Sequence, residues 1–441
     1  MERIVVKFGG SSVADGKQIA KVAAIVAADR RRRIVVVSAP GKRREEERKL
    51  TDLLYLCHDM AALGTSIAEP FAEIYGRFAL IADQLGLSPA LLDQLDSFRG
   101  ELEQGCGRDY AASRGEYFSA RMIASYLGGE FVDPADHITI LPGGRIDEDS
   151  YRALGERLGD PERLYVMAGF YGSDPAGRVV TFSRGGSDIS GAIAARAAGA
   201  VLYENWTDTS GNLMADPRLV KNPRPIEEIS FREIREMAYM GASVFHDEAI
   251  VPVREKGIPI RIRNTNRPEE PGTLITPQLS PASLGETEIA GIAGRRGFVM
   301  LCLEKSLLSK EKGFLHRLLG IFEEHGVGCE QCPSSIDSIS VLVEACRLDG
   351  LEEVLCEEIR RRLRPDSLVV ERDLALIAVV GEGMVRTIGI AAKIFAALHK
   401  AAVNVRVINQ GASEMNIIVG VAGEDYARAV GALYAAFVAE G

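Results

Sequence analysis

A lysine followed by paired glycines closes the first apolar run of the chain. The segment reads Lys7-Phe8-Gly9-Gly10-Ser11-Ser12 and leads into a helical pattern at Gln18. Paired glycines after a strand let backbone N–H groups approach a phosphate, and Lys7 and the following helix N-terminus add positive potential. The spacing is not that of a P-loop, in which the lysine follows the glycines. The segment indicates local phosphate binding, with an ordinary tight turn as the alternative.

A second glycine-rich loop, at 183–188, precedes the helical run from Ile189 to Ala198. It reads Ser-Arg-Gly-Gly-Ser-Asp. Ser187 or Asp188 can cap the helix, and Arg184 beside its two glycines presents a planar fork that suits a carboxylate or a phosphate. The loop is therefore expected to bind an anion.

Glu116 belongs to a third polar motif, Ser113-Arg114-Gly115-Glu116. The pattern predicts that a helix begins here, which would place the carboxylate near a helix N-terminus. A first-turn glutamate that interacts only with the helix dipole is the alternative to a ligand-binding role. The residue types alone leave both interpretations open.

The first two thirds of the chain alternate short apolar runs with amphipathic stretches. Continuous apolar strands separated by helices are typical of a mostly parallel sheet covered on both faces. Four prolines between Arg267 and Leu284 indicate a domain exit and linker, which places the boundary near residue 290. Strands are predicted at Arg33 to Ser38, Leu164 to Ala168, Ala200 to Tyr203 and Ile258 to Ile262, and helices at Gln18 to Ala28 and Ile189 to Ala198.

The C-terminal part, 291–441, contains an internal repeat with an offset of 76 positions. Each copy reads as helix, strand, turn, strand and helix, which with a preceding strand makes a βαββαβ unit. The copies are placed at 305–378 and 379–441, the second completed by the strand near 298–303. Such a pair indicates a small-ligand sensor. The matching positions are Gly313 and Gly389, Leu318 and Ile394, Phe322 and Leu398, Val327 and Val403, Val341 and Ile417, and Val343 and Val419.

Composition bounds the class of protein. The 441 residues include 46% hydrophobic and 26% charged side chains, which is enough for a large core and about three domains. Acidic residues outnumber basic ones by 62 to 52, and the net charge of −10 argues against a nucleic-acid surface built on bulk positive charge. Without a signal peptide or an 18-residue apolar run, the chain is expected in the cytoplasm, off any membrane, with its seven cysteines reduced.

Taken together, the motifs resemble those of the aspartate kinases. The C-terminal repeat is similar to the tandem ACT domains of the same family. The resemblance implies an α/β fold of the amino acid kinase (carbamate kinase-like) type, an α/β/α sandwich with a mostly parallel sheet at 1–290, followed by two α+β ACT domains at 291–441. The matching segments occur in the family's order: Lys7 to Ser12, Val36 to Ala39, Ser113 to Glu116, Ser183 to Asp188, Trp206 to Asp208 and Ala215 to Arg218.

The reaction implied by this resemblance is phosphorylation of L-aspartate by ATP with Mg²⁺, giving 4-phospho-L-aspartate, the first step of lysine, threonine and methionine biosynthesis. The acceptor carboxylate has an ordinary pKa near 3.9 and is ionised at pH 7, so no general base is required. Catalysis should depend on positioning and on cationic shielding of the transferred phosphoryl group. Mg²⁺ is expected to bind through the nucleotide, with no metal site built by the protein.

The resemblance also assigns roles to single residues. Arg184 would clamp the α-carboxylate of aspartate and Glu116 would receive its α-ammonium. Lys7 and Asp188 would form the catalytic pair. Trp206, the only tryptophan, is interpreted as a packing residue. The further aspartate-binding positions are Ser38, Thr51, Gly185 and Ser187, and the ATP-binding positions are Lys7, Gly9, Gly10, Ser11, Thr207, Asp208 and Arg218.

The sequence departs from the family pattern in three places. The charged segment 41–50 is longer than in better-known members and predicts a solvated loop, or a lid over ATP. Leu213 stands where many relatives have a tyrosine near adenine, and Ser243 where many have a phosphate-contacting lysine. An aspartate kinase is still the first hypothesis, because the aspartate-binding positions are all present. A kinase for another carboxylate, such as glutamate or N-acetylglutamate, and a non-catalytic amino-acid sensor are the alternatives.

The first repeat also offers an effector site. Glu330, Asp337 and Ser338 fall in the strand-turn-strand region where ACT domains of this family bind an amino acid. Two carboxylates there suit the ammonium groups of lysine, which is the hypothesis for feedback inhibition. Threonine, alone or with lysine, is the alternative effector. The ACT domains further imply a homodimer or a homotetramer.

Two short motifs suggest metal or redox chemistry but have a simpler interpretation. Cys329 and Cys332 align with apolar residues of the second copy, Val405 and Ile408, which predicts that both thiols fill a core. Only His325 is near enough in sequence to add a third zinc ligand. In the run 246–248, His-Asp-Glu, the single histidine lacks a second ligand at helical spacing. No metal site is predicted.

Overall fold

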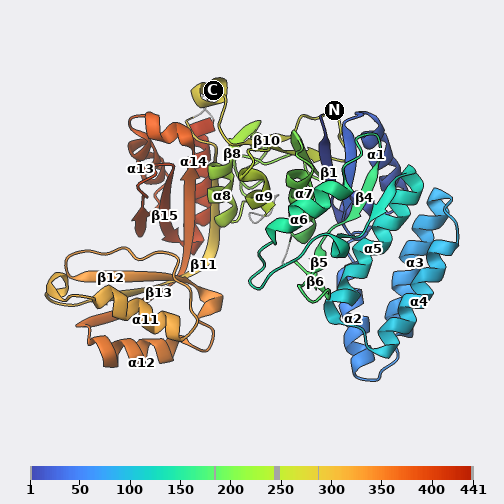
Figure 1. Ribbon diagram of the computed structural model, residues 1–441. Coiled ribbons are helices and arrows are strands. Elements are labelled where there is room, and N and C mark those ends of the chain that lie inside the picture. The colour runs from blue at the N-terminus through green and yellow to red at the C-terminus, as the bar shows by residue number, and fades with distance from the viewer. Residues whose placement is uncertain (1, 183–184, 243–248, 287, 439–441) are drawn as a thin grey trace. The chain divides into compact units, whose positions relative to one another are not determined.

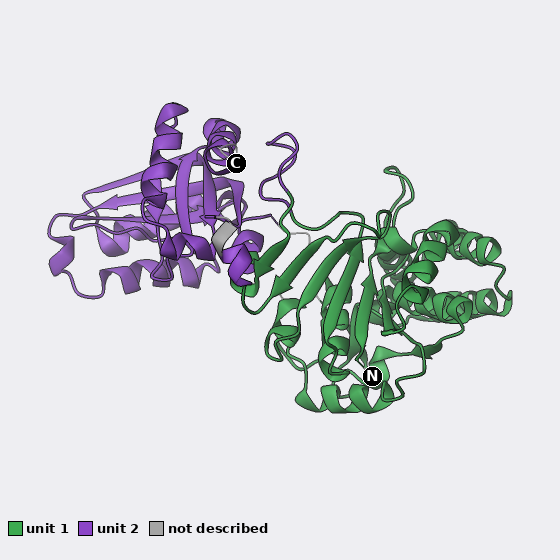
Figure 2. Cartoon of the chain, turned by 90° about the horizontal axis from the view of Figure 1, so that it is seen from above, with its two compact units in different colours: residues 1–212, 225–234, 243–279 green, residues 213–224, 235–242, 280–441 purple. Residues whose placement is uncertain are grey.

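The chain divides into two compact units, shown in separate colours in Figure 2. The computed structural model describes residues 2–182, 185–242, 249–286 and 288–438. Unit 1 contains Met1–Asn212, Pro225–Ile234 and Ser243–Leu279, and unit 2 contains Leu213–Arg224, Arg235–Ala242 and Ser280–Gly441. The chain enters unit 2 for the last time at Ser280, before the boundary expected near residue 290. Two short earlier segments also belong to unit 2.

Unit 1 is built on one large sheet (Figure 1), in the order β3-β4-β2-β1-β7-β9-β10-β8. Every pair in it is parallel except β9 with β10. This mostly parallel sheet with its helices confirms the predicted fold class. The strands are β1 (Ile4–Phe8), β2 (Arg32–Val37), β3 (Glu130–Val132), β4 (Tyr165–Ala168), β7 (Leu202–Thr207), β8 (Glu228–Ser230), β9 (Ile260–Asn264) and β10 (Thr273–Thr276), and a separate hairpin joins β5 (Tyr171–Ser173) to β6 (Val179–Thr181).

Helices pack on this sheet from opposite sides because side chains alternate along each strand. Ile4, Val6 and Phe8 of β1 face a core formed with α1 to α5, whereas Lys7 points toward α7, which contacts β1, β2 and β7. None of the helices in the described ranges is both long and apolar enough to cross a membrane. The helices are α1 (Gly16–Ala27), α2 (Leu50–Ala62), α3 (Ala68–Leu85), α4 (Ala90–Gln104), α5 (Arg108–Leu127), α6 (Glu148–Arg157), α7 (Gly186–Ala197), α8 (Phe231–Tyr239) and α9 (Ile250–Arg254).

The predicted strands correspond to β2, β4, β7 and β9, with ends shifted by a few residues. The linker predicted at 267–284 is wrong in part, because it contains β10 and the start of α10 (Pro281–Glu286). Thr273 and Ile275 of β10 are buried, while Leu274 between them is half-buried. This alternation places β10 beside β9 and β8 despite the prolines on either side.

Unit 2 carries a five-stranded antiparallel sheet in the order β12-β11-β13-β15-β14. Gly313 and Gly389 occupy the same position before α11 and α13, each with a positive φ, 74° and 92°, that glycine adopts readily. The elements are β11 (Gly291–Glu304), α11 (Phe314–Glu324), β12 (Ser338–Glu344), α12 (Glu352–Leu363), β13 (Ser367–Val380), α13 (Ile390–Lys400), β14 (Val407–Asn409), β15 (Asn416–Ala422) and α14 (Tyr426–Val438).

Two long strands are shared between the copies of the repeat. The second part of β11, Phe298 to Glu304, pairs with β12 and with the first part of β13. The first part of β11, Gly291 to Arg296, pairs with the second part of β13, which in turn pairs with β15. The strand near 298–303 therefore lies in the first copy, and it is 291–296 that lies beside the second.

Candidate active site

A pocket of about 780 Å³ opens at the carboxyl ends of β1, β2 and β4. Helices α2 and α5 and the first turn of α7 complete its walls. Open parallel sheets bind their ligands at this edge, because the loops that follow the strands converge there. The predicted site residues that line it are Lys7, Gly10, Ser38, Thr51, Glu116, Gly185, Ser187 and Asp188.

Lys7, Asp188 and Asn205 form a buried polar cluster at this pocket. Lys7 Nζ makes an ion pair with Asp188 Oδ1 and donates to Asn205 Oδ1 at 3.4 Å, while Asn205 Nδ2 donates to Asp188 Oδ1 at 3.0 Å. Register explains the contact, because Asn205 lies directly opposite Lys7 in the pairing of β7 with β1. Asn205 could not be predicted from the sequence, in which its only signal is its place in a strand beside Trp206.

The glycine loop after β1 is held by backbone contacts. The Gly9 N–H donates to the Trp206 carbonyl at 3.0 Å. This N–H therefore stabilises the loop rather than a phosphate, contrary to its expected role. A Cβ at Gly10 would lie 3.0 Å from the Ala39 carbonyl oxygen, and the Gly41 N–H donates to the Gly10 carbonyl at 2.9 Å. Glycine at position 10 lets the loops after β1 and β2 meet at the pocket.

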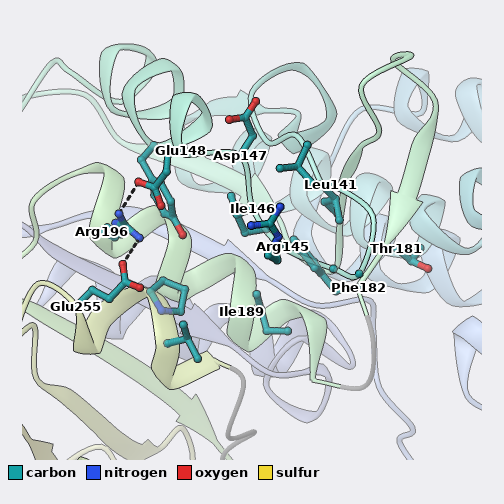
Figure 3. Close-up of a pocket in the computed structure, with 16 residues that line it drawn as sticks. Leu141, Arg145, Ile146, Asp147, Glu148, Thr181, Phe182, Ile189, Arg196 and Glu255 are labelled. Carbon is teal, nitrogen blue, oxygen red and sulfur yellow. Dashed lines mark hydrogen bonds and ion pairs between the residues drawn. The ribbon is translucent and has the colours of Figure 1, made fainter.

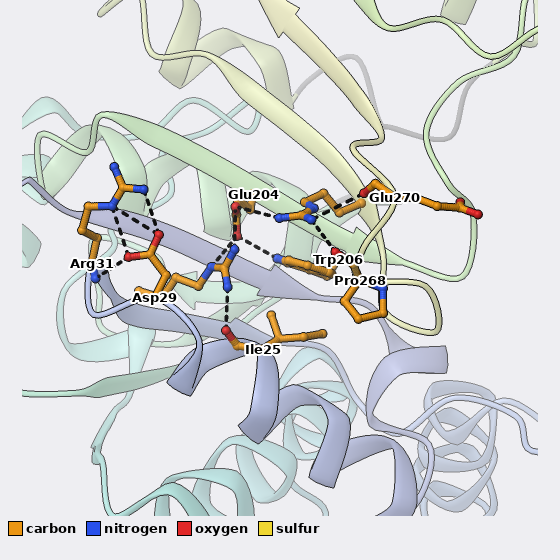
Figure 4. Close-up of polar contacts among 9 residues, drawn as sticks. Ile25, Asp29, Arg31, Glu204, Trp206, Pro268 and Glu270 are labelled. Carbon is orange, nitrogen blue, oxygen red and sulfur yellow. Dashed lines mark hydrogen bonds and ion pairs between the residues drawn. The ribbon is translucent and has the colours of Figure 1, made fainter.

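Trp206 is fixed by the buried pair of Glu204 and Arg32 and by the half-buried Arg263; Figure 4 shows Glu204 beside Trp206. Glu204 Oε2 accepts from Trp206 Nε1 at 3.0 Å and from Arg32 Nε at 2.8 Å. The Arg263 guanidinium lies 4.6 Å from the Trp206 ring centroid, and burial lowers its pKa. The predicted packing role is confirmed, since the indole is 1% exposed and stacks on Phe8. These side chains thus fix the carbonyl that holds the glycine loop.

Glu116 is a buried carboxyl group that faces the pocket. It lies in the middle of α5, which begins at Arg108, so the prediction that a helix begins at Ser113 is wrong. Burial raises the pKa of Glu116 to about 8, against the opposing effects of the Ala39 N–H and Lys7. Its Oε2 atom is buried without a hydrogen-bond partner among the described residues. A buried acceptor without a partner is costly, so this atom suits a cationic ligand group.

The other predicted aspartate-binding residues surround the same pocket. The Ser38 N–H donates to the Phe8 carbonyl at 3.1 Å, which fixes the start of the loop after β2. Thr51 lies in the first turn of α2, and Ser187 in the first turn of α7. Gly185 precedes α7 with a φ of 78°, a conformation that favours glycine. Arg184, the predicted clamp for the α-carboxylate, lies outside the described residues.

The charged segment 41–50 contributes two cations to the pocket. Lys42 and Lys49 line it, although most of the segment is exposed. Arg43 and Glu47 form an ion pair at 2.6 Å within the segment. The segment therefore has the solvated character that its composition predicts and also carries side chains that can reach an anionic ligand.

Two of the predicted ATP-binding residues lie at the end of β7 and do not line the pocket. The Thr207 hydroxyl donates to Asp208 Oδ1 at 3.2 Å, and the Thr207 carbonyl accepts from the Thr265 N–H at 2.8 Å. Ser11 lies in the short 3₁₀ helix Gly10–Val13 that follows β1. These positions surround the carboxyl ends of β1 and β7, which are neighbours in the sheet.

Arg218 belongs to unit 2, where its exposed guanidinium pairs with Asp216 at 2.7 Å. The hydrogen bond from Arg218 lowers the pKa of Asp216. Leu213 also belongs to unit 2, and Ser243 lies outside the described residues. Their predicted relation to the nucleotide therefore stays a prediction.

The predicted effector residues all lie in the first copy of the repeat, but Glu330 lies beside the second half of β12, whereas Asp337 and Ser338 lie at its start. Two of them already have partners. Glu330 Oε2 accepts from Arg295 at 3.4 Å and from the Tyr239 hydroxyl. Asp337 Oδ1 accepts from the Leu307 N–H at 3.0 Å, and Ser338 begins β12. A lysine ammonium at Glu330 would thus compete with a guanidinium.

The prediction that both Cys329 and Cys332 fill a core is wrong for Cys329, which is exposed. Cys332 is half-buried against the core of the first copy. The aligned Val405 and Ile408 are themselves not buried, so the alignment with the second copy does not identify core positions here. No group of three or more His, Cys, Asp or Glu side chains suited to a metal occurs in the described part of the chain, and 246–248 lies outside it.

A second pocket in unit 1, of about 650 Å³, contains none of the predicted site residues (Figure 3). Its Arg196 pairs with Glu148 at 2.7 Å and with Glu255 at 2.6 Å. The same guanidinium stacks on Tyr151, 3.8 Å from the ring centroid. Carboxylates outnumber cations in this lining by three to two, so the pocket is less suited to phosphate than the one beside Lys7.

Comparisons with known proteins agree with this fold. Residues 2–264 match the model of the amino acid kinase family, and residues 377–437 match an ACT domain. Aspartokinase 3 of Bacillus subtilis is 40% identical over 99% of this chain and 98% of its own length. The crystal structure of Clostridium acetobutylicum aspartate kinase is 46% identical, with a TM-score of 0.94 over 98% of this chain and all of that one.

E. coli aspartokinase III is a more distant structural relative. Its complex with aspartate and ADP is 28% identical, with a TM-score of 0.76 over 99% of both chains. Its complex with lysine and aspartate is 27% identical, with a TM-score of 0.75 over 99% of this chain and all of that one. The chain belongs to the amino acid kinase family and, within it, to the aspartate kinases.

Proposed function

We propose that this chain transfers the γ-phosphoryl group of ATP to the side-chain carboxylate of L-aspartate. The observation that carries the proposal is the 780 Å³ pocket, in which the Lys7–Asp188 pair and the carboxyl group of Glu116 line one cavity. Such a pocket can hold an anionic phosphoryl group near Lys7 and a zwitterionic amino acid near Glu116. The complex of the E. coli relative with aspartate and ADP supports the assignment of both ligands.

Aspartate binding is assigned to the residues around Glu116. The α-ammonium group would supply the partner that Glu116 Oε2 lacks among the described residues. Ser38, Thr51, Gly185 and Ser187 would contact the rest of the substrate, and Arg184 would clamp the α-carboxylate, as the family resemblance implies. With both ends of the backbone held, the side-chain carboxylate is left free to react.

Phosphoryl transfer is assigned to Lys7, which would shield the charge on the transferred group. Asp188 and Asn205 hold the lysine ammonium in place. The carboxylate oxygen of aspartate attacks the γ-phosphorus, the bond to the β-phosphate oxygen breaks, and ADP leaves with that electron pair. Mg²⁺ bound to the nucleotide would add positive charge. Of the three carboxylates that line the pocket, Asp188 pairs with Lys7 and Glu116 is assigned to aspartate, which fits metal binding through the phosphates.

Trapping the acyl phosphate with hydroxylamine tests the substrate. With ATP and Mg²⁺, L-aspartate should give the hydroxamate, and glutamate and N-acetylglutamate should give none above background. The Lys7→Ala variant is the matched blank, because it removes the cation and keeps the strand. Product from another acid but not from aspartate would favour the second function, and no product from any acid would favour a non-catalytic sensor.

Feedback inhibition by lysine at Glu330, Asp337 and Ser338 is the regulatory part of the proposal. The lysine complex of the E. coli relative supports it, together with the two carboxylates in the first copy of the repeat. Lysine should inhibit at or below millimolar concentration, whereas threonine should act only if it shares the site. No response to lysine in an activity titration would remove the idea. The predicted homodimer or homotetramer can be measured in the same samples by light scattering.

A further inference from the structure

The active-site pocket needs more positive charge than its paired side chains supply. Lys7 forms an ion pair with Asp188, so the two together carry little net charge. The proposed reaction brings a carboxylate against a polyphosphate, and two anions approach each other only where cations offset their repulsion. Among the described residues that line the pocket, Lys42 and Lys49 are the cations without a carboxylate partner.

The main chain on both sides of Lys49 is held in place. The Arg48 carbonyl accepts from Arg77 Nη2 at 2.6 Å, and the Lys49 carbonyl accepts from the Leu53 N–H at 3.1 Å in the first turn of α2. The side chain of Lys49 is exposed and makes no hydrogen bond or ion pair with the described residues. Its backbone is therefore fixed, while its ammonium group is free to bind a ligand.

Lys42 is held beside the glycine loop that follows β1. The Gly41 N–H donates to the Gly10 carbonyl at 2.9 Å, and a Cβ at position 41 would lie 2.6 Å from the Gly10 carbonyl carbon. On the other side of Lys42, the Arg43 N–H donates to Glu47 Oε2 at 2.9 Å. Within the described residues, Lys42 Nζ donates only to a main-chain carbonyl of the same segment, so its charge is not neutralised.

Arg77 is a buried cation on α3 that secures the residue before Lys49. Its side chain is 4% exposed, and its Nη2 atom donates to the Arg48 carbonyl and, at 2.7 Å, to Glu73 Oε1. Its Nε and Nη1 atoms are buried without a hydrogen-bond partner among the described residues. Burying a guanidinium group with so few partners is unfavourable for stability. Its contact with the Arg48 carbonyl therefore points to a role in positioning the segment.

We propose that Lys42 and Lys49 bind the phosphate groups of the nucleotide, with Arg77 as a positioning residue, an inference that rests on the proposed function. A lysine ammonium group carries three donors and binds phosphate oxygens as a point charge. Lys42 lies near the start of the segment 41–50 and Lys49 directly before α2, so cations from both ends of the segment reach the same pocket. Beside Lys7, they would offset the repulsion between the phosphoryl group and the acceptor carboxylate.

Calorimetric titration of sodium tripolyphosphate into the full-length chain, at constant ionic strength, tests the site without turnover. Lys49→Ala and Lys42→Ala should each weaken binding about tenfold, as expected for the loss of a hydrogen bond between charged groups. Lys49→Arg should stay within about threefold of the wild type. The control is Arg44→Ala, which removes an exposed cation of the same segment that does not line the pocket, and it should bind as the wild type does.

Three results of this titration would overturn the assignment. The first is undetectable binding of tripolyphosphate to the wild type. The second is wild-type affinity in either alanine variant, Lys42→Ala or Lys49→Ala. The third is an equal loss in Arg44→Ala, which would show that binding depends on the total charge of the segment and not on a site.

A double-mutant cycle tests the positioning role of Arg77. Arg77→Met should weaken tripolyphosphate binding about threefold in the wild-type background and should have no effect in the Lys49→Ala background, because Arg77 acts through Lys49. Equal losses in both backgrounds would show that Arg77 does not position this lysine. Arg77→Lys, which keeps a cation and loses the planar fork, is the second variant if the methionine variant does not fold.

Steady-state assays separate this inference from the proposed function. In a chain that forms the aspartate hydroxamate, Lys49→Ala should raise the KM for ATP about tenfold and leave aspartate binding without nucleotide within about threefold of the wild type. Weaker aspartate binding with unchanged tripolyphosphate binding would assign Lys49 to the acceptor and overturn the inference. A chain without aspartate kinase activity that still loses tripolyphosphate affinity in Lys49→Ala would refute the proposed function and leave the phosphate site intact.

Discussion

Aspartate binding should depend steeply on pH, because the α-ammonium group must bind an ionised Glu116. With a pKa of about 8 in the empty pocket, Glu116 is ionised in about one molecule in eleven at pH 7. Each pH unit below 8 then weakens aspartate binding about tenfold, or about 1.4 kcal/mol. Binding at pH 7 should also release about 0.9 proton, since the bound ammonium lowers the pKa of the carboxyl group.

Isothermal titration calorimetry measures both quantities. Aspartate is titrated into the full-length chain at pH 6, 7 and 8, in two buffers with different ionisation enthalpies, with Glu116→Gln beside the wild type. The Glu116→Gln variant should bind aspartate weakly, its affinity should not change with pH, and binding should release no proton. Glu69→Gln, at an exposed position of α3, is the control and should behave as wild type. An affinity that is flat from pH 6 to 8, with no proton released, would refute the role of Glu116.

Three further outcomes follow from the same contacts. Asn205→Leu should lower kcat about 10- to 100-fold and leave the KM for aspartate nearly unchanged, because it removes hydrogen bonds to the charged Lys7 pair; a changed KM with normal kcat in steady-state assays would contradict this. Glu204→Gln should destabilise unit 1 by about 3–5 kcal/mol in denaturant unfolding, since it leaves the buried Arg32 guanidinium without its carboxylate partner, whereas Asp29→Asn, at the more exposed pair with Arg31, should match wild type. The ligand-free chain should lose stability as pH rises from 4.5 through 8, because the folded state keeps Glu116 protonated. If the melting temperature of Glu116→Gln changes with pH as much as that of the wild type, Glu116 is not the cause of this loss.

The elements that local pattern determines could be predicted. Apolar runs identified β2, β4, β7 and β9, and the spacing of glycine and apolar residues showed both copies of the repeat. The errors arose where a local signal was overridden by packing. The Ser113–Glu116 motif suggested a helix boundary, but it lies inside α5, where position 115 is glycine because a Cβ there would come within 2.9 Å of the Ala39 Cβ. Prolines hid β10, which is stabilised by its neighbours in the sheet.

In the candidate site, too, residues in local motifs could be predicted, whereas contacts that depend on packing could not. Lys7, Glu116 and Asp188 stand in motifs and could be identified from residue types and family resemblance. Asn205 could not, because its contact with Lys7 depends on the register of strands nearly two hundred residues apart in sequence. The raised pKa of Glu116 likewise comes from burial by several distant segments, which no local pattern encodes.

Phosphorus NMR with labelled aspartate is the most direct test of the central claim. L-Aspartate carrying ¹⁸O in its side-chain carboxylate is mixed with the full-length chain, ATP and Mg²⁺. We predict an acyl phosphate whose phosphorus signal carries the isotope shift of a bridging ¹⁸O, because a carboxylate oxygen attacks the γ-phosphorus. ADP that accumulates with inorganic phosphate, while neither the acyl phosphate nor its hydroxamate in the presence of hydroxylamine is detected, would show transfer to water and would contradict the claim.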